Sequence, residues 1–225
     1  MSITIKTVAT KRDLKTFVRF ANRLYKGNRY YVPCMPFDDM NTLRKETNAA
    51  FDFCEAELYL AYKDGKVVGR VAAIINHKAN AAWNVEQVRF GWFDFIDDIN
   101  VSSALLESVI AFGKAHGMKQ IVGPLGFTDF DPEGMLVEGF DRLSTMALIY
   151  NHPYYPEHMK KLGYVKETGW VEYRITIPDA LPERHIQIAV IPVSGISRFV
   201  EFFFSLIATI FQKREGSSCC SCSSS

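Results

Sequence analysis

Two hydrophobic patterns alternate in the middle of the chain. Apolar residues recur at helical spacing along one face, namely Leu105, Leu106, Val109, Ile110 and Phe112. The segments on either side, which begin at Phe93 and at Ile121, are typical of strands. We therefore predict a strand–helix–strand unit, in which Ser102 or Ser103 caps the helix and His116-Gly117 ends it.

The turn before this helix is a candidate anion-binding site. The first N–H groups of a helix have no acceptor within the helix, and the helix dipole favours a negative charge beside them. Such a turn therefore favours an anion, for example a pyrophosphate group.

Apolar and polar residues alternate in several segments before this unit. Ser2 to Val8 has the pattern of a half-buried strand, and a helix with one apolar face opens after Thr10. Residues 57–62 and 67–76 are strand-like and are joined by Lys-Asp-Gly-Lys, which predicts an antiparallel hairpin. Residues 85–95 continue as a third strand. We expect these strands to form one sheet with the later unit.

The remaining segments before residue 178 are less regular. Residues 156–162 predict a short helix, and residues 165–177 predict extended chain. The segment 27–36, GNRYYVPCMP, is too broken by prolines for a long helix. Its Tyr30 and Tyr31 either contact a ligand or pack within the loop.

The composition of the chain changes after residue 178. A chain of 225 residues that is 48% hydrophobic predicts one main domain, which we place at 1–178. The remainder, 179–225, contains an apolar run at 199–211 that suits a buried, interfacial or signal-type segment better than a membrane span. Its Ser- and Cys-rich end either carries lipid-modified cysteines or has no evolved function. The sequence therefore does not favour membrane association through this tail.

Charge and cysteine content narrow the class of protein. The 26 Lys and Arg residues balance 25 Asp and Glu residues, which disfavours a nucleic-acid partner. The five cysteines lack the spacing of a disulfide framework, which fits a reducing compartment. The N-terminus has no apolar run of signal-peptide length. We therefore expect a cytoplasmic protein without a nucleic-acid partner.

Two stretches and the predicted order of elements resemble the GCN5-related N-acetyltransferase (GNAT) superfamily. NVSSALLESVIAFGKAHGMKQIVGP, from Asn100, resembles its cofactor-binding turn and helix, and NHPYYPEHMKKLGYVKETGWVEYRI, from Asn151, resembles its late helix and final strand. A third stretch, GPLGFTDFDPEGMLVEGFD, is similar to a poorly characterised group of bacterial acyltransferase-like proteins. The resemblance implies an α/β (α+β) fold with a mixed, largely antiparallel sheet, helices on both faces and splayed central strands.

The resemblance also implies a function. It suggests an acyl-CoA-dependent N-acyltransferase, an N-acetyltransferase in the first place, with acetyl-CoA or another acyl-CoA as co-substrate and a small-molecule or peptide amine as acceptor. The CoA pyrophosphate would lie on residues Asn100, Val101, Ser102, Ser103 and Ala104. Asp97, Asn100 and Ser102 depart from the family's Gln/Arg-x-x-Gly-x-Gly turn. These departures keep open the alternative of a catalytically silent ligand-binding or interaction module.

Two residues are the candidates for proton transfer. The resemblance places a general-acid tyrosine where this chain has Met159, and Tyr155 lies one helical turn earlier, with His158 as its rival. The candidate bases, Glu138 and Glu133, lie in the insert 128–151, which we expect to line the acceptor side of the cleft. We favour Glu138, because its apolar neighbours would raise its pKa. No histidine or carboxylate spacing here predicts a metal site, so we expect no metal ion.

Overall fold

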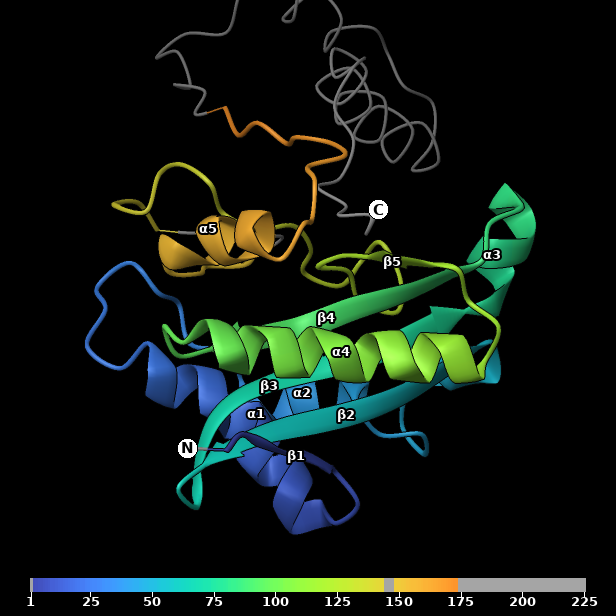
Figure 1. Cartoon of the computed structure of the whole chain (residues 1–225), viewed down its shortest axis with the longest axis horizontal. Helices are drawn as coiled ribbons and strands as arrows, with labels where there is room; N and C mark the ends of the chain where they lie inside the picture. Colours follow the sequence, from blue (N-terminus) through green and yellow to red (C-terminus); the bar gives the residue numbers. More distant parts are fainter. Residues whose placement is uncertain (1, 144–147, 174–225) are drawn as a thin grey trace, which may run out of the picture. The chain divides into compact units, whose positions relative to one another are not determined.

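The computed structural model describes residues 2–143 and 148–173 (Figure 1). The chain divides into two compact units, and the described part of the first ends at Thr168. The second begins at Gly169, so only its first few residues are described. The predicted boundary at residue 178 and the predicted tail lie outside the described residues and stay predictions.

The first unit alternates strands and helices along the chain. Its elements are β1 (Thr4–Thr7), α1 (Lys11–Leu24), α2 (Pro36–Thr42), the 3₁₀ helix η1 (Ala49–Asp52), β2 (Cys54–Lys63), β3 (Lys66–Asn76), α3 (His77–Trp83), β4 (Gln87–Phe95), α4 (Ile99–Ala115), β5 (Gln120–Val122) and α5 (Tyr154–Lys161). None of the described residues from 165 onward belongs to a strand. None of the helices in the described part of the chain has the length and apolarity that a membrane span requires.

The five strands form one mixed sheet in the order β1-β2-β3-β4-β5. The first three pairings are antiparallel, and β4 pairs with β5 in parallel. Asp64 and Gly65 both have positive φ in the two-residue turn between β2 and β3, as the predicted hairpin requires. The β4–β5 ladder covers only Gln87 to Arg89, and β4 continues without a ladder partner in β5. The predicted mixed, largely antiparallel sheet is thus confirmed.

Helices cover both faces of the sheet, as predicted. Successive side chains of a strand point to opposite faces, so Val71, Ala73 and Ile75 join the cluster under α4, whereas Ala72 and Ile74 join the cluster under α1. Figure 1 shows α4 in front of the sheet and α1 and α2 behind it. The core therefore consists of two apolar layers that share β3.

An irregularity in β4 bends the strand near its end. Ala72 pairs with Gly91 and Arg70 pairs with Asp94, so β4 has one more residue than β3 between these pairs. Trp92 has a φ of 44°, which a side chain other than glycine rarely adopts. Such a bulge interrupts the ladder and turns the strand. It directs Trp92, Phe93 and Asp94 toward a cavity beside the sheet.

The start of α4 differs from the prediction. The helix begins at Ile99, and the Asp98 carboxylate caps it by accepting a hydrogen bond from the Asn100 N–H at 3.0 Å. Ser102 is instead buried, and its hydroxyl donates to the Ile99 carbonyl at 3.0 Å. The predicted cap at Ser102 or Ser103 is therefore wrong, because Asp98, four residues before Ser102, is a strong cap and complements the helix dipole.

Replacing this cap is expected to have a moderate effect. Asp98→Ala should lower the free energy of unfolding by about 1 kcal/mol, because the Asn100 N–H loses its acceptor. A hydrogen bond from Lys63 holds the pKa of Asp98 below its ordinary value, so the stabilisation is present above the unfolded carboxyl pKa and is lost as the pH falls through the folded one. Urea unfolding at neutral and acidic pH measures both effects. Asp98→Asn keeps a capping oxygen, and an equal loss in this control variant would contradict the capping role.

Candidate functional site

A cavity of about 420 Å³ lies beside the bulge of β4. Five parts of the chain line it: α1 with the loop that follows, α2, the adjoining ends of β3 and β4, the segment after β5 with its insert, and the start of α5. Its walls are mostly apolar, and they include Val32, Pro33, Trp92, Phe93, Pro124, Met135, Leu148 and Ile149. The size and lining of this cavity are typical of a small-molecule site.

The floor of the cavity holds a buried ion pair. Arg70 and Asp94 are 4% and 5% exposed, and both Nε and Nη2 of Arg70 lie 2.7 Å from Asp94 Oδ2. Arg70 Nη1 also donates to the backbone carbonyls of Phe17 and Val18 at 3.0 and 3.3 Å. Charged groups are rarely buried unless they are paired in this way. The pair therefore joins α1, β3 and β4 beneath the cavity.

Two tyrosines extend this pair into a hydrogen-bond chain. The Tyr25 hydroxyl donates to Asp94 Oδ1 at 2.9 Å and lies 2.8 Å from the Tyr155 hydroxyl. A phenol has a single hydrogen, so Tyr155 donates to Tyr25 and accepts from the Phe95 N–H at 3.0 Å. Burial, with the charge of Asp94, raises the pKa of both phenols well above the ordinary value. Both tyrosines therefore stay protonated at neutral pH.

The charge of the cavity is negative overall. Its described charged residues are Arg70, Asp94 and the half-buried Asp39, which leaves one carboxylate in excess. Burial lowers the pKa of Arg70, but the two carboxylates raise it more, and the net result lies above the ordinary value. An apolar cavity with an excess carboxylate favours a ligand that carries one positive charge.

Cys34 is the only described cysteine that lines the cavity. Burial, with the nearby Asp39 carboxylate, raises the pKa of its thiol to about 12. The thiolate is the nucleophilic form of cysteine, and it is scarce at neutral pH under these conditions. Cys34 is therefore part of the wall rather than a nucleophile.

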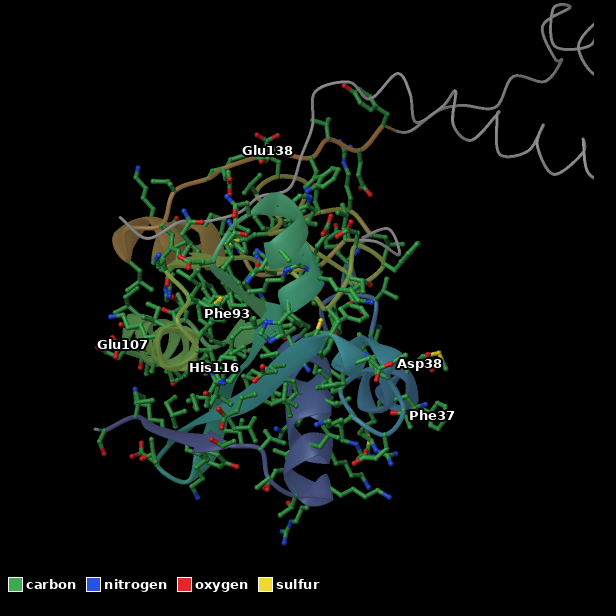
Figure 2. All side chains as sticks on the ribbon, turned by 90° about the vertical axis from the view of Figure 1, so that its right-hand side faces the viewer. Phe37, Asp38, Phe93, Glu107, His116 and Glu138 are labelled. Carbon is green, nitrogen blue, oxygen red and sulfur yellow. The ribbon has the colours of Figure 1, made fainter. Side chains whose placement is uncertain are left out.

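The two predicted catalytic residues do not come together. Tyr155 lines the cavity, is 1% exposed, and stacks on Phe95 with ring centroids 4.1 Å apart. Glu138 is exposed and does not line the cavity, and Figure 2 shows its side chain at the outer edge of the domain. Their roles as acid and base stay predictions, and the geometry gives Glu138 no part in this cavity.

Described residues of the insert line the cavity, and their place on the acceptor side stays a prediction. These residues are Pro132, Gly134, Met135, Leu148, Ile149, Tyr150 and Asn151. Asn151 anchors this wall, because its side chain accepts from the Leu136 N–H at 2.7 Å and donates to the Leu136 carbonyl at 3.1 Å. The sequence analysis also singled out Tyr30 and Tyr31 in the loop between α1 and α2. Tyr31 lines the cavity, and its hydroxyl donates to Asn22 Oδ1 at 2.7 Å.

The predicted pyrophosphate site is closed in this structure. The Asn100 N–H donates to the Asp98 side chain, and the Val101 and Ser102 N–H groups donate to the Asp98 carbonyl. Ser103 and Ala104 follow inside α4, where each N–H is used by the helix ladder. The carboxylates of Asp97 and Asp98 also precede the helix at this turn, and a negative charge beside a phosphate repels it. Residues Asn100 to Ala104 therefore do not fit a CoA pyrophosphate.

A second contact closes the same turn. His158 is buried on α5, with Nδ1 lying 3.0 Å from the Ser102 hydroxyl and Nε2 lying 3.0 Å from Asp97 Oδ1. This series has the order of a catalytic triad. Ser102 is fully buried, however, so no substrate reaches its hydroxyl. The contact fastens α5 to the start of α4.

The sequence analysis missed Arg70, Asp94, Tyr25 and Asp39. A signal was present for the buried pair, because Arg70 and Asp94 each interrupt an apolar strand. The bulge in β4 decides which β3 residue faces Asp94, and no spacing in the sequence reveals it. Tyr25 and Asp39 carry no comparable signal.

Two curated proteins are similar to this chain in sequence, and solved structures are similar to it in fold. No family model matches the chain. The chain is 31% identical over 162 residues to Protein YghO of Escherichia coli (strain K12), covering 72% of this chain and 41% of that protein. It is 25% identical over 182 residues to the bacterial ceramide synthase of Caulobacter vibrioides (strain NA1000 / CB15N), covering 80% of this chain and 47% of that protein. The chain thus spans less than half the length of these curated relatives.

Among solved structures, a tandem GNAT protein from the clavulanic acid biosynthesis pathway superposes with a TM-score of 0.50. The sequence identity is 12%, and the match covers 74% of this chain and 45% of that protein. Five strands with one parallel pair, a bulged β4 and helices on both faces agree with this likeness. The chain therefore has the fold of the GNAT superfamily that its sequence resembles.

Proposed function

We propose that this domain binds a primary amine with a long apolar group and presents it for N-acylation. The observation that carries the proposal is the apolar cavity with a buried carboxylate in its floor and a second carboxylate in its wall. The ammonium group would lie near Asp94 and Asp39, and the apolar group would lie against the insert. The sequence left two classes of acceptor, a small-molecule amine and a peptide amine. The proposal selects the small-molecule amine.

The residues of the cavity can supply the binding and proton chemistry of amide formation. In N-acylation the ammonium group first loses a proton, and the resulting amine nitrogen forms a bond to the acyl carbon. The leaving group departs with the electron pair of its former bond and takes up one proton, while the nitrogen gives up a second, so that one proton is released overall. Arg70 and Tyr25 hold Asp94 as an oriented anion that attracts the ammonium group. Asp39 is half-buried and touches solvent, so it can pass the released proton to water. Tyr155 holds Tyr25 in place.

One relative supports an apolar amine. A ceramide is the amide of a long-chain amino alcohol with a fatty acid, so the name of the Caulobacter relative describes an N-acylated, apolar product. An acyl-CoA is the donor that the fold suggests. In this proposal its pyrophosphate would have to lie elsewhere than on Asn100 to Ala104, because Asp98 closes that turn.

A catalytically silent binding module is the second candidate. The observation that favours it is the same closed turn, since a domain with the GNAT fold and no donor site would still bind the amine. The two candidates share the cavity and differ in whether an amide forms. Mass spectrometry of mixtures that contain the amine and an acyl-CoA distinguishes them.

Asp39→Asn is expected to weaken amine binding about fivefold, which corresponds to the loss of roughly 1 kcal/mol for a partly exposed charge pair. Titration calorimetry with sphinganine, a long-chain amino alcohol, and the full chain measures the dissociation constant. Asp38→Asn is the matched control. It removes the same charge one position earlier in the chain, and Asp38 does not line the cavity. Figure 2 shows Asp38 at the outer surface.

The binding and product measurements together test the proposal. Weaker binding in Asp39→Asn alone supports the cavity as the amine site. An equal loss in Asp38→Asn, or no binding of sphinganine by the unchanged chain, contradicts it. Binding together with an amide product supports acyl transfer, whereas binding without a product at any donor concentration supports the silent module.

A further inference from the structure

The loop between α1 and α2 and the first turn of α2 expose large apolar side chains beside the cavity. Val32, Met35 and Phe37 are 57%, 66% and 71% exposed. Val32 also lines the cavity, so it stands at the cavity mouth. Figure 1 shows this loop projecting from the end of α1, and Figure 2 shows Phe37 at the outer edge of the domain. Exposed apolar groups that gather next to a site mark an interaction surface.

Basic residues outnumber acidic ones around these side chains. The stretch 23–38 contains three basic residues, Arg23, Lys26 and Arg29, and one acidic residue, the exposed Asp38. All three basic side chains are exposed, and within the described part of the chain none forms an ion pair. This combination of exposed apolar and basic residues is typical of segments that lie in a membrane interface.

The loop is held in place rather than hanging free. The Asn22 side chain donates to the Cys34 carbonyl at 3.1 Å and accepts from the Tyr31 hydroxyl at 2.7 Å. These bonds fold the apolar part of the loop back beside the end of α1, where Arg23 lies. Tyr30 and Tyr31 pack with Tyr25 and Tyr150, which fixes the loop to the cavity wall. The loop that carries Val32 and the basic residues Lys26 and Arg29 therefore has a fixed position beside the cavity wall.

We propose that Val32, Met35 and Phe37 insert into the surface of a lipid bilayer with anionic headgroups, so that the cavity mouth faces the membrane. Arg23, Lys26 and Arg29 bind the headgroups by charge. The bilayer is favoured over a protein partner because the apolar surface continues into an apolar cavity. An apolar amine held in a bilayer could enter that cavity without crossing water, and this last step alone rests on the proposed function.

The test uses the full chain and vesicles of defined composition. Met35→Ser/Phe37→Ser should lower co-sedimentation with vesicles of equal parts phosphatidylcholine and phosphatidylglycerol about tenfold, because two inserted side chains lose their apolar contact. Neither residue lines the cavity, so sphinganine binding in vesicle-free solution should stay unchanged. Trp83→Ser is the matched control, because Trp83 is 61% exposed on α3 at the other end of the sheet.

The basic residues form a second arm of the test. Arg23→Gln/Lys26→Gln/Arg29→Gln should weaken binding to the mixed vesicles, and the effect should disappear in pure phosphatidylcholine or at high salt. Equal loss in Trp83→Ser, unchanged binding in the Met35/Phe37 variant, or no binding by the unchanged chain would overturn the proposal. A concentration-dependent mass change on sedimentation that the Met35/Phe37 variant abolishes would assign the surface to a second copy instead. Sphinganine binding that fails while vesicle binding survives would count only against the proposed function.

Discussion

Asp94→Ala is expected to lower the free energy of unfolding by about 3 to 5 kcal/mol. The substitution leaves the guanidinium of Arg70 buried without the carboxylate that accepts from both its Nε and its Nη2, and an uncompensated buried charge is among the most destabilising single changes. It also removes the acceptor of the Tyr25 hydroxyl. Urea unfolding at neutral pH, followed by circular dichroism, gives the difference directly.

A double variant distinguishes the loss of the charge partner of Arg70 from the loss of side-chain volume at position 94. Arg70→Met/Asp94→Leu removes both charges and keeps apolar volume, so it should regain most of the stability that Asp94→Ala loses. Lys63→Ala breaks the much more exposed pair with Asp98 and should cost less than about 1 kcal/mol. An Asp94→Ala loss as small as that of Lys63→Ala would show that the pair does not hold the sheet as described.

The regular part of the fold could be predicted because it depends on local patterns. The apolar face of α4 and the Asp-Gly turn between β2 and β3 both depend on residues that are close in the sequence. The structure contains both as predicted. The start of α4 was misplaced because Asn-Val-Ser-Ser looks like a capping sequence. Asp98 caps the helix instead, because its backbone is extended and its carboxylate accepts a hydrogen bond from the Asn100 N–H.

The candidate site could be predicted only in part. Tyr155 was found because one helical turn separates it from Met159, which is a local relation. Glu138 was chosen from its apolar neighbours alone, and the insert has no periodicity that would say which way a side chain points. The pairing of Arg70 with Asp94 depends on the bulge between them, and a shift of one residue in register would move Asp94 to the other face of the sheet. Long-range register of this kind is not encoded in any single stretch.

The turn after β5 presses on β4 at Gly91, and this contact fixes one wall of the cavity. A Cβ atom at Gly91 would lie 2.4 Å from the Leu125 carbonyl oxygen, which belongs to the backbone and cannot rotate away. The Leu125 N–H donates to the Phe90 carbonyl at 2.8 Å, and Arg89 Nη1 donates to the Gly126 carbonyl at 3.2 Å. Both bonds hold the segment where it is, so the strand and the segment must separate to admit a methyl group.

Gly91→Ala is therefore expected to lower the free energy of unfolding by about 2 kcal/mol or more, and to weaken sphinganine binding because Pro124 moves with the segment it belongs to. Gly113→Ala on α4 is the comparison variant. Its new Cβ would lie 2.6 Å from Val88 Cγ1 and 3.0 Å from Val88 Cβ, which are side-chain rather than backbone atoms, and alanine favours a helix over glycine by about 1 kcal/mol, which offsets part of the clash. Urea unfolding should show a larger loss at Gly91 than at Gly113, and calorimetry should show weaker sphinganine binding at Gly91 alone. Equal losses at the two positions would mean that the backbone contact with Leu125 is not what sets the shape of the cavity.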